Sequence, residues 1–251
     1  MLIFYFVPCQ KSEELRRLAI GDIHGNLDAL LAALETAHFD PAKDKLYFLG
    51  DYVDRHPKSR GVVDYILTVP DKICIRGNHD QYLLDHFDQT GPLRPISDQW
   101  QRNGGFDTLE SYGVEIINPG TDIWFSDGDI PKAHLDFYKS ALPYHITSDN
   151  QALVHGGFDL YLQDMTYDFV MWDRTMWKTA LREEDSRDIS FPCFREYPTI
   201  FIGHTNLLEN PTQRHCLPKK CLNVWNLDTG AGYAGPLTVM DMETEEFWQS
   251  W

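Results

Sequence analysis

The sequence is poor in positive charge. Lys and Arg total 22 against 38 Asp and Glu, which gives a formal net charge of −16. Nucleic-acid-binding proteins usually carry a basic face, so this balance argues against a nucleic-acid partner. A bound cation can reverse the field within one cleft, so the same balance does not exclude a phosphorylated substrate.

Paired cysteines and long apolar runs are also lacking. The five cysteines are odd in number and irregularly spaced, which does not fit a disulfide-rich secreted protein. We therefore expect reduced thiols and a cytoplasmic location. Residues 1–7 are apolar, but they follow no basic region and are too short to cross a membrane. We expect an added strand or a frayed tail there, and no membrane partner.

Two common phosphate or nucleophile motifs are missing as well. The chain has no G-x-x-x-x-G-K-[ST] and no serine nucleophile elbow. The run Gly230-x-Gly232-x-x-Gly235 matches the dinucleotide-binding spacing, but residues 236–239 continue as a strand rather than a helix. The helix N-terminus that would hold a pyrophosphate is absent, so we expect a glycine-rich hairpin turn.

The apolar pattern that is present predicts an α/β sheet. Short apolar strands at residues 17–20, 46–49 and 72–75 each lead through a polar turn into a helical pattern. Between residues 85 and 144 many glycines and prolines interrupt the pattern. There we expect a mainly helical insertion over the mouth of the sheet, with Trp100, Phe106, Leu109 and Tyr112 on one helical face.

Strand patterning resumes after the insertion. We expect strands at residues 152–154, 199–202, 221–227 and 237–240, with Phe247 and Trp248 closing a sheet edge. At 251 residues the chain fits one large domain.

Side chains able to bind a metal follow the strands. They are Asp22, His24, Asp51, Asn78, His79, His155 and His204. Ligands of open α/β sheets gather at the carboxyl ends of strands, so we expect these side chains to converge. Oxygen and imidazole donors without thiolate suit Mn, Fe or Zn in a hydrolytic site. Their number suits two ions roughly 3.5–4 Å apart that share one ligand and clamp a phosphate.

Five segments at these strand ends resemble the metallophosphoesterase signature, and more closely the phosphoprotein phosphatases in their compact bacterial or phage form. They are Gly21-Asp22-Ile23-His24-Gly25, Gly50-Asp51-Tyr52-Val53-Asp54-Arg55, Arg76-Gly77-Asn78-His79-Asp80, His155-Gly156-Gly157 and Gly203-His204-Thr205. The resemblance implies a calcineurin-like α/β fold, a β-sandwich of two mixed sheets flanked by helices. A single domain would span residues 1–251, with the helical cap insertion at 85–144.

The resemblance also implies two divalent metal ions, with Mn²⁺ expected and Fe or Zn as alternatives. Their ligands would be Asp22 and His24 for the first ion, Asp51 as the bridge, and Asn78, His155 and His204 for the second.

Four further residues would act on the substrate. His79 would be the general acid, with Asp54 holding its imidazole, and a cap of the following turn is the alternative role for Asp54. Arg55 and Arg174 would bind the phosphate oxygens through their planar guanidinium groups. For Arg174, a surface salt bridge is the alternative.

The activity implied is hydrolysis of phosphomonoesters by in-line attack of metal-bound hydroxide, as in a Ser/Thr phosphoprotein phosphatase. The partner would be a phosphorylated protein or a small phosphoester. Symmetrical dinucleoside polyphosphate hydrolases share these motifs, so diadenosine tetraphosphate is an alternative substrate. A catalytically silent phosphate-sensing scaffold is a third alternative, but such a protein would normally have lost ligands, and none is missing.

One position departs from the family pattern. The phosphoprotein phosphatases continue with glycine after the arginine, whereas here Arg55 is followed by His56 and Pro57. A side chain and a restricted φ replace the glycine, which alters the loop beside the phosphate. We expect His56 at the rim of the cleft, where it would influence substrate choice.

Overall fold

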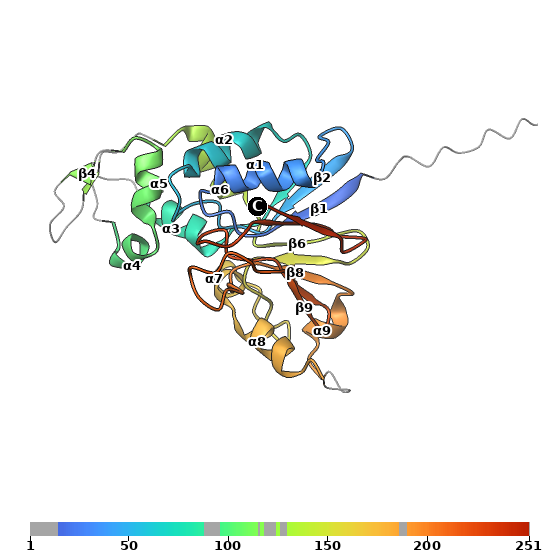
Figure 1. Ribbon diagram of the computed structural model, residues 1–251. Coiled ribbons are helices and arrows are strands. Elements are labelled where there is room, and N and C mark those ends of the chain that lie inside the picture. The colour runs from blue at the N-terminus through green and yellow to red at the C-terminus, as the bar shows by residue number, and fades with distance from the viewer. Residues whose placement is uncertain are drawn as a thin grey trace, which may run out of the picture.

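A computed structural model describes residues 15–87, 96–114, 116–117, 124–125, 130–185 and 190–250. The apolar residues 1–7, for which an added strand or a tail was expected, lie outside these ranges. Two five-stranded sheets face each other, and helices cover the outer face of each one (Figure 1). The predicted β-sandwich of two mixed sheets flanked by helices is therefore confirmed.

The first sheet has the strand order β12-β11-β1-β2-β3. Its parallel part is β1 (Arg16–Ile20), β2 (Asp44–Phe48) and β3 (Lys72–Cys74). β11 (Thr238–Asp241) pairs antiparallel with β1, and β12 (Phe247–Gln249) pairs antiparallel with β11 and closes the edge as predicted.

The second sheet has the order β6-β7-β8-β10-β9. β7 (Ala152–Val154), β8 (Ile200–Ile202) and β10 (Val224–Asn226) run parallel in its centre. β6 (Tyr144–Ile146) and β9 (Lys219–Cys221) pair antiparallel at its two edges. One strand was predicted over residues 221–227, but the chain forms the β9–β10 pair there.

The helices form two outer layers. Those beside the first sheet are α1 (Leu27–Thr36), α2 (Ser59–Thr68), α3 (Asn78–Phe87), α5 (Gly105–Ser111) and α6 (Lys132–Ser140), and those beside the second are α7 (Tyr167–Trp172), α8 (Thr175–Arg182) and α9 (Cys193–Glu196). Asn26 caps α1, because its side chain accepts a hydrogen bond from the Ala29 amide. None of the described helices is long and apolar enough to cross a bilayer.

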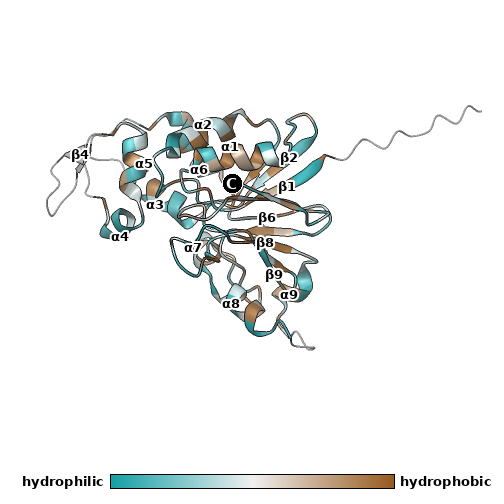
Figure 2. Ribbon diagram, viewed as in Figure 1, coloured by the Kyte–Doolittle hydropathy of each residue, from teal (hydrophilic) through white to brown (hydrophobic). Residues whose placement is uncertain are grey.

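Three apolar clusters hold the layers together. One joins the first sheet to its helices, one joins the second sheet to its helices, and the third fills the space between the sheets. The middle cluster includes Leu153, Phe201 and Met240, all fully buried. Figure 2 shows β8 as hydrophobic, as expected of a central strand buried on both faces.

The segment predicted to be helical between residues 85 and 144 is helical in much of its described part, although no single helix carries Trp100 and Tyr112. α4 (Asp98–Arg102) ends before Gly104, and α5 begins directly after it. Gly104 has φ 97°, and a Cβ there would lie 2.4 Å from the Arg55 amide nitrogen. The close approach to Arg55 breaks the helix. Two short strands, β4 (Ile116–Ile117) and β5 (Trp124–Phe125), also pair in this segment.

The glycine-rich run at residues 230–235 is not a hairpin turn, so that prediction was wrong. β10 before it pairs with β8 and β9, whereas β11 after it pairs with β1 and β12. The run therefore crosses from the second sheet to the first. The alternation of residues predicts two strands but does not say which strands pair.

Candidate metal centre

The proposed metal ligands lie at the tips of strands from both sheets. Asp22 follows β1, Asp51 follows β2 and Asn78 opens α3 after β3, all in the first sheet. His155 follows β7 and His204 follows β8 in the second sheet. These strand ends meet near the facing helices α3 and α7, where the rings of Tyr82 and Trp172 are 5.5 Å apart (Figure 1). All of the predicted ligands are buried.

Two ligand triads share Asp51. One consists of His24, Asp51 and His79, and the other of Asp51, His155 and His204, with the donor atoms of each triad within 4.8 Å of one another. The shared carboxylate is what a bridging ligand between two ions requires. The first triad includes His79, which was not expected to be a ligand, and does not include Asp22.

Asp22 and Asn78 lie beside the triads. An Asp22 oxygen is 4.0 Å from His24 Nε2. Asn78 Oδ1 is 3.1 Å from His155 Nε2, which itself lies 3.3 Å from an Asp51 oxygen. The structure thus brings all six predicted ligands into one cluster.

Backbone carbonyls orient two of the imidazoles. Nδ1 of His24 is 3.0 Å from the Val53 carbonyl, and Nδ1 of His155 is 2.7 Å from the Leu49 carbonyl. A carbonyl can only accept, so each Nδ1 carries the proton and donates it. Nε2 of each ring therefore faces the cluster, and it can bind a metal whenever it carries no proton, the usual arrangement for histidine ligands.

The cluster combines groups of strongly shifted pKa. Burial disfavours the charged form of Asp51, but His155 and His79 outweigh burial and hold its pKa well below the usual value. Burial also opposes protonation of His155, yet Asp51 beside it raises the pKa of His155 to about 10. Burial, with His155 and Arg174 nearby, lowers the pKa of His204 to about 2. His204 is therefore a neutral imidazole, the form that binds metals.

The residues present fit a pair of divalent cations. Asp22 Oδ1 and His204 Nε2 are buried and have no hydrogen-bond partner within the described part of the chain, although buried polar atoms are nearly always satisfied. Burial, together with Asp228 and Asp51 nearby, raises the pKa of Asp22 well above its usual value. Cations among these carboxylates would relieve their repulsion and satisfy both atoms.

A second group of side chains surrounds His79. Its Nδ1 is 2.6 Å from an Asp54 oxygen, and Asp54 is fully buried. Trp100 Nε1 donates to both Asp54 oxygens at 3.0 and 3.1 Å, and the Thr108 hydroxyl donates to one of them at 2.6 Å. These donors hold the carboxylate in place, and the carboxylate in turn fixes the ring of His79 with Nε2 toward the cluster.

Arg55 reaches the centre of the cluster, whereas Arg174 lies at its rim. The two terminal nitrogens of Arg55 are 3.0 Å from His24 Nε2 and 3.2 Å from His79 Nε2. Arg174 is exposed and donates to the His204 carbonyl and the Thr205 hydroxyl. The cluster therefore has one guanidinium at its centre and a second at its rim.

A family model described as calcineurin-like phosphoesterase matches residues 15–225, which include every residue of the cluster. The chain belongs to this family. A curated relative from Pseudomonas fluorescens (strain SBW25), named bis(5'-nucleosyl)-tetraphosphatase, symmetrical, is 25% identical over 268 residues and is matched over 91% of this chain and 92% of its own.

Solved structures agree on the fold of this phosphoesterase. A putative diadenosine tetraphosphatase has a TM-score of 0.58 at 18% identity and covers 94% of each chain. A protein serine/threonine phosphatase from Saccharomyces cerevisiae has a TM-score of 0.55 at 14% identity and covers 96% of this chain and 82% of its own.

Sequence reasoning missed two buried carboxylates in this phosphoesterase. Asp80 accepts the backbone amides of Asp51, Tyr52 and Gly77 at 2.8–2.9 Å and so fixes the turn that carries Asp51. Asp228 follows β10 and lies close enough to Asp22 to raise its pKa. Asp228 is a strand-end acid like the others, so the same signal could have identified it.

The phosphoesterase backbone is strained at this cluster. His24, Asp51, Asp54, Arg55 and His204 all have φ between 51° and 74°, a region that residues other than glycine rarely occupy. Such strain persists only where the surroundings enforce it, and it is typical of functional sites. The site residues therefore occupy conformations set by the site rather than by local preference.

His56 does not take the left-handed conformation that a glycine would allow, because its φ is not among the positive ones of the described residues. It is half-buried directly after Arg55, and its carbonyl would lie 2.4 Å from a Cβ on Gly25. The turn is accommodated by positive φ at Asp54 and Arg55 instead. The influence of His56 on substrate choice stays a prediction.

Metal uptake by this phosphoesterase should release protons. At pH 7 His155 holds a proton because its pKa is about 10, and the proton must leave before Nε2 can bind a metal. We expect at least one proton released on Mn²⁺ binding, and an apparent affinity that rises roughly tenfold per pH unit between pH 7 and 9. Calorimetry in two buffers of different ionisation enthalpy counts the protons.

His145→Gln is the control for this measurement, because His145 lies outside both triads. It should leave the proton count unchanged. Binding without proton release at pH 7 would show that His155 is neutral before the metal arrives.

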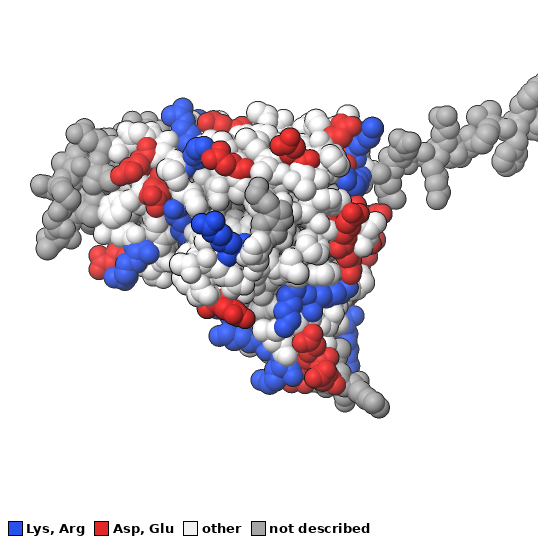
Figure 3. Space-filling model, viewed as in Figure 1, with Lys and Arg blue, Asp and Glu red and all other residues white. Residues whose placement is uncertain are grey.

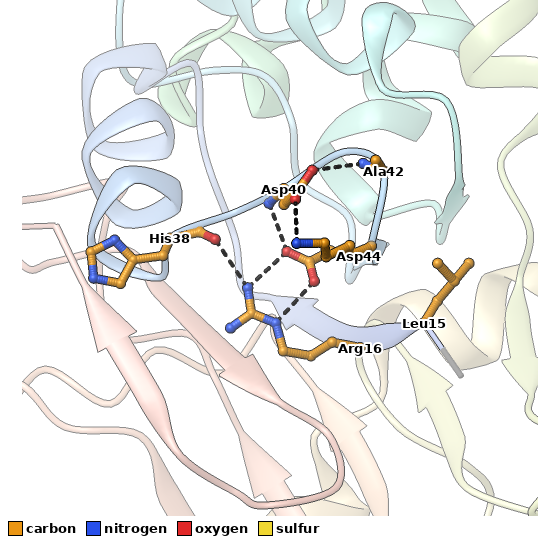
Figure 4. A pocket seen from close by; sticks show the side chains of 7 residues that line it. Leu15, Arg16, His38, Asp40, Ala42 and Asp44 are labelled. Atoms are coloured by element: carbon orange, nitrogen blue, oxygen red, sulfur yellow. Dashed lines mark hydrogen bonds and ion pairs between the residues drawn. The ribbon is translucent and has the colours of Figure 1, made fainter. Parts of the chain in front are cut away.

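Another cavity lies away from the cluster. It has a volume of about 740 Å³ and surrounds the amino ends of β1 and β2, where Arg16 pairs with Asp44 and donates to the carbonyls of Ala37 and His38 (Figure 4). Arg16 is held by these partners, so the arrangement fixes the strand ends.

On the face shown in Figure 3, basic and acidic side chains are interspersed rather than gathered into a basic patch.

Proposed function

We propose that this phosphoesterase hydrolyses bis(5'-nucleosyl) tetraphosphates symmetrically, producing two nucleoside diphosphates. The observation that carries this proposal is the similarity to a symmetrical bis(5'-nucleosyl)-tetraphosphatase along nearly the full length of both chains. The convergent carboxylates and imidazoles supply metal ligands, and the arginines supply cations for the phosphate oxygens, as hydrolysis of a phosphoanhydride needs. This substrate replaces the phosphoprotein as the first expectation.

The cluster would hold two divalent ions, with Asp51 between them. When bound, the ions would offset the negative charge of the phosphoryl oxygens and lower the pKa of a water for in-line attack. Asp22 and His24 would serve the first ion, and Asn78, His155 and His204 the second, with Mn²⁺ as the expected metal.

The remaining residues would orient the substrate and handle the proton of the leaving group. Arg55, and Arg174 from the rim, would bind the phosphoryl oxygens on either side of the attacked phosphorus. His79 would carry a proton on Nε2 and give it to the oxygen of the departing nucleotide as the P–O bond breaks. Asp54 would keep that ring in place through the 2.6 Å contact with Nδ1.

Phosphoprotein phosphatase activity is the second candidate, and the His79–Asp54 pair favours it. A departing serine or threonine alkoxide is a strong base, so its departure depends on a general acid. A departing nucleoside diphosphate is a much weaker base and needs the acid less. A buried acid whose partner Asp54 is itself fixed by Trp100 and Thr108 is more than an anhydride requires, so both substrate classes must be compared directly.

A substrate panel separates the two candidates. With Mn²⁺ added, we expect kcat/KM for diadenosine tetraphosphate to exceed that for a phosphoserine peptide by about 100-fold. The reference substrate is p-nitrophenyl phosphate, which belongs to neither class. This expectation corresponds to a difference in transition-state binding of about 2.7 kcal/mol. Chromatography should show ADP as the nucleotide product rather than ATP and AMP. A higher kcat/KM for the phosphopeptide would favour the second candidate.

A further inference from the structure

Two loops beside the metal centre are bonded to each other. The first follows β8 and the second follows β10. The Leu207 amide donates to the Asp228 carbonyl at 3.0 Å, and the Ala234 amide donates to the Pro211 carbonyl at 3.3 Å. These hydrogen bonds hold residues 205–213 and 227–236 together as one rim.

The second loop is packed directly against the centre. A Cβ on Gly232 would lie 2.5 Å from the His24 ring and 2.8 Å from the Arg55 guanidinium, so only glycine fits there. The next residue, Tyr233, places its ring 4.6 Å from the Arg55 guanidinium carbon. A cation over an aromatic face at this distance is attractive. The loop therefore ties Tyr233 to the proposed phosphate-binding arginine.

A cavity of about 230 Å³ opens on this rim. We call it the loop pocket. Its lining residues are Asn206, Leu208, Glu209, Asn210, Pro211 and Tyr233. Tyr233 is 42% exposed, which is unusual for a large ring held against a buried site. Leu208, Pro211 and the Tyr233 ring provide apolar surface, and the other three provide polar groups.

We propose that the loop pocket binds the purine base of one nucleoside of the substrate, an inference that rests on the proposed function. Tyr233 would offer its ring to the base, since every nucleobase has a face that stacks on aromatic side chains. Arg55, in contact with the same ring, would bind the adjoining phosphate. One residue pair thus spans the junction between the phosphates and the nucleoside.

The polar groups of the loop pocket select the kind of ligand. Glu209 is an acceptor and repels anions, so the pocket suits an uncharged base that carries an amino group rather than a phosphate. Asn206 accepts the Leu208 amide with its Oδ1, which leaves its NH₂ group to donate to a ring nitrogen. An acceptor beside a donor matches the edge of adenine better than that of hypoxanthine, which has a carbonyl in place of the amino group.

The first test fills the pocket. In Leu208→Trp, the ratio of kcat/KM for diadenosine tetraphosphate to that for p-nitrophenyl phosphate should fall roughly tenfold. Leu217→Trp is the matched control, because Leu217 is 63% exposed and does not line the cavity. The ratio should not change in the control.

The second test does not need the nucleotide to be cleaved. ADP and pyrophosphate are compared as inhibitors of p-nitrophenyl phosphate hydrolysis. In the unsubstituted protein ADP should inhibit roughly tenfold better than pyrophosphate, and Leu208→Trp should remove that advantage.

Glu209→Gln, a change on the exposed rim, should reduce the preference for diadenosine over diinosine tetraphosphate.

The outcomes separate the two proposals. If diadenosine tetraphosphate is not cleaved but ADP loses its advantage in Leu208→Trp, the loop pocket stands and the proposed function fails. If the tetraphosphate is cleaved and neither Leu208→Trp nor Glu209→Gln changes any ratio, the base lies elsewhere and the loop pocket is overturned.

Discussion

Asp51→Asn should lower kcat/KM for every substrate on the order of 10³-fold or more. Asp51 is the only residue common to both triads, and asparagine keeps its shape while removing its charge. Without that charge, two cations would face each other with no anion between them. Burial would then disfavour the pair, because an uncompensated charge in a low-dielectric site is costly.

Metal analysis is the decisive readout for Asp51→Asn. We expect the Mn²⁺ content of the purified protein to fall from two ions per chain to one or fewer. Asp28→Asn is the control, because Asp28 is an exposed acid paired with Lys58 outside the site. Full metal content in Asp51→Asn would show that another group bridges the ions.

His79→Asn should give an effect that depends on the leaving group. For a phosphoserine peptide we expect kcat to fall about 10²–10⁴-fold, the usual contribution of a general acid. For diadenosine tetraphosphate and p-nitrophenyl phosphate, whose leaving groups are weak bases, the loss should be closer to tenfold. A plot of log kcat against leaving-group pKa should become steeper in the variant.

The same variant tests which role His79 plays. The sequence assigns it to proton transfer, whereas the geometry also places it in the triad with His24 and Asp51. If it is the acid, the metal content of His79→Asn should match that of the unsubstituted protein. A loss of one ion would make it a ligand instead. His145→Asn, outside both triads, is the control for the histidine substitution.

The α/β character of the chain and the strand-end ligands follow from a single physical pattern, whereas the sandwich of two sheets was expected only from the resemblance to the metallophosphoesterases. Apolar strands that end in Asp or His can be recognised locally, and parallel strands bring their carboxyl ends to one edge. This is why Asp22 and Asp51 could be placed together. His155 follows a strand of the second sheet, so its place beside them depends on how the two sheets face each other. No knowledge of side-chain contacts was needed.

Contacts made across long stretches of chain could not be predicted in this way. Trp100 has the pattern of a core residue on a helix, and nothing local reveals that its indole nitrogen donates to Asp54. Thr108 does the same from the next helix. The segment predicted as a cap insertion therefore supplies two donors to the carboxylate that positions His79. The partners of β10 and β11 were missed for the same reason, because strand pairing is a property of the assembled sheets.

The division of the ligands between the sheets has a consequence for the reaction itself. Asp51 belongs to one sheet, and His155 and His204 to the other. The spacing of two bound ions would therefore depend on how closely the sheets approach, and that approach depends on side chains such as Leu153 and Phe201 in the apolar cluster between them. A methyl group added or removed there would change the distance between Asp51 and the two histidines without altering any group that takes part in the reaction. Packing in the hydrophobic core thus sets the distance between the metal ligands of the two sheets.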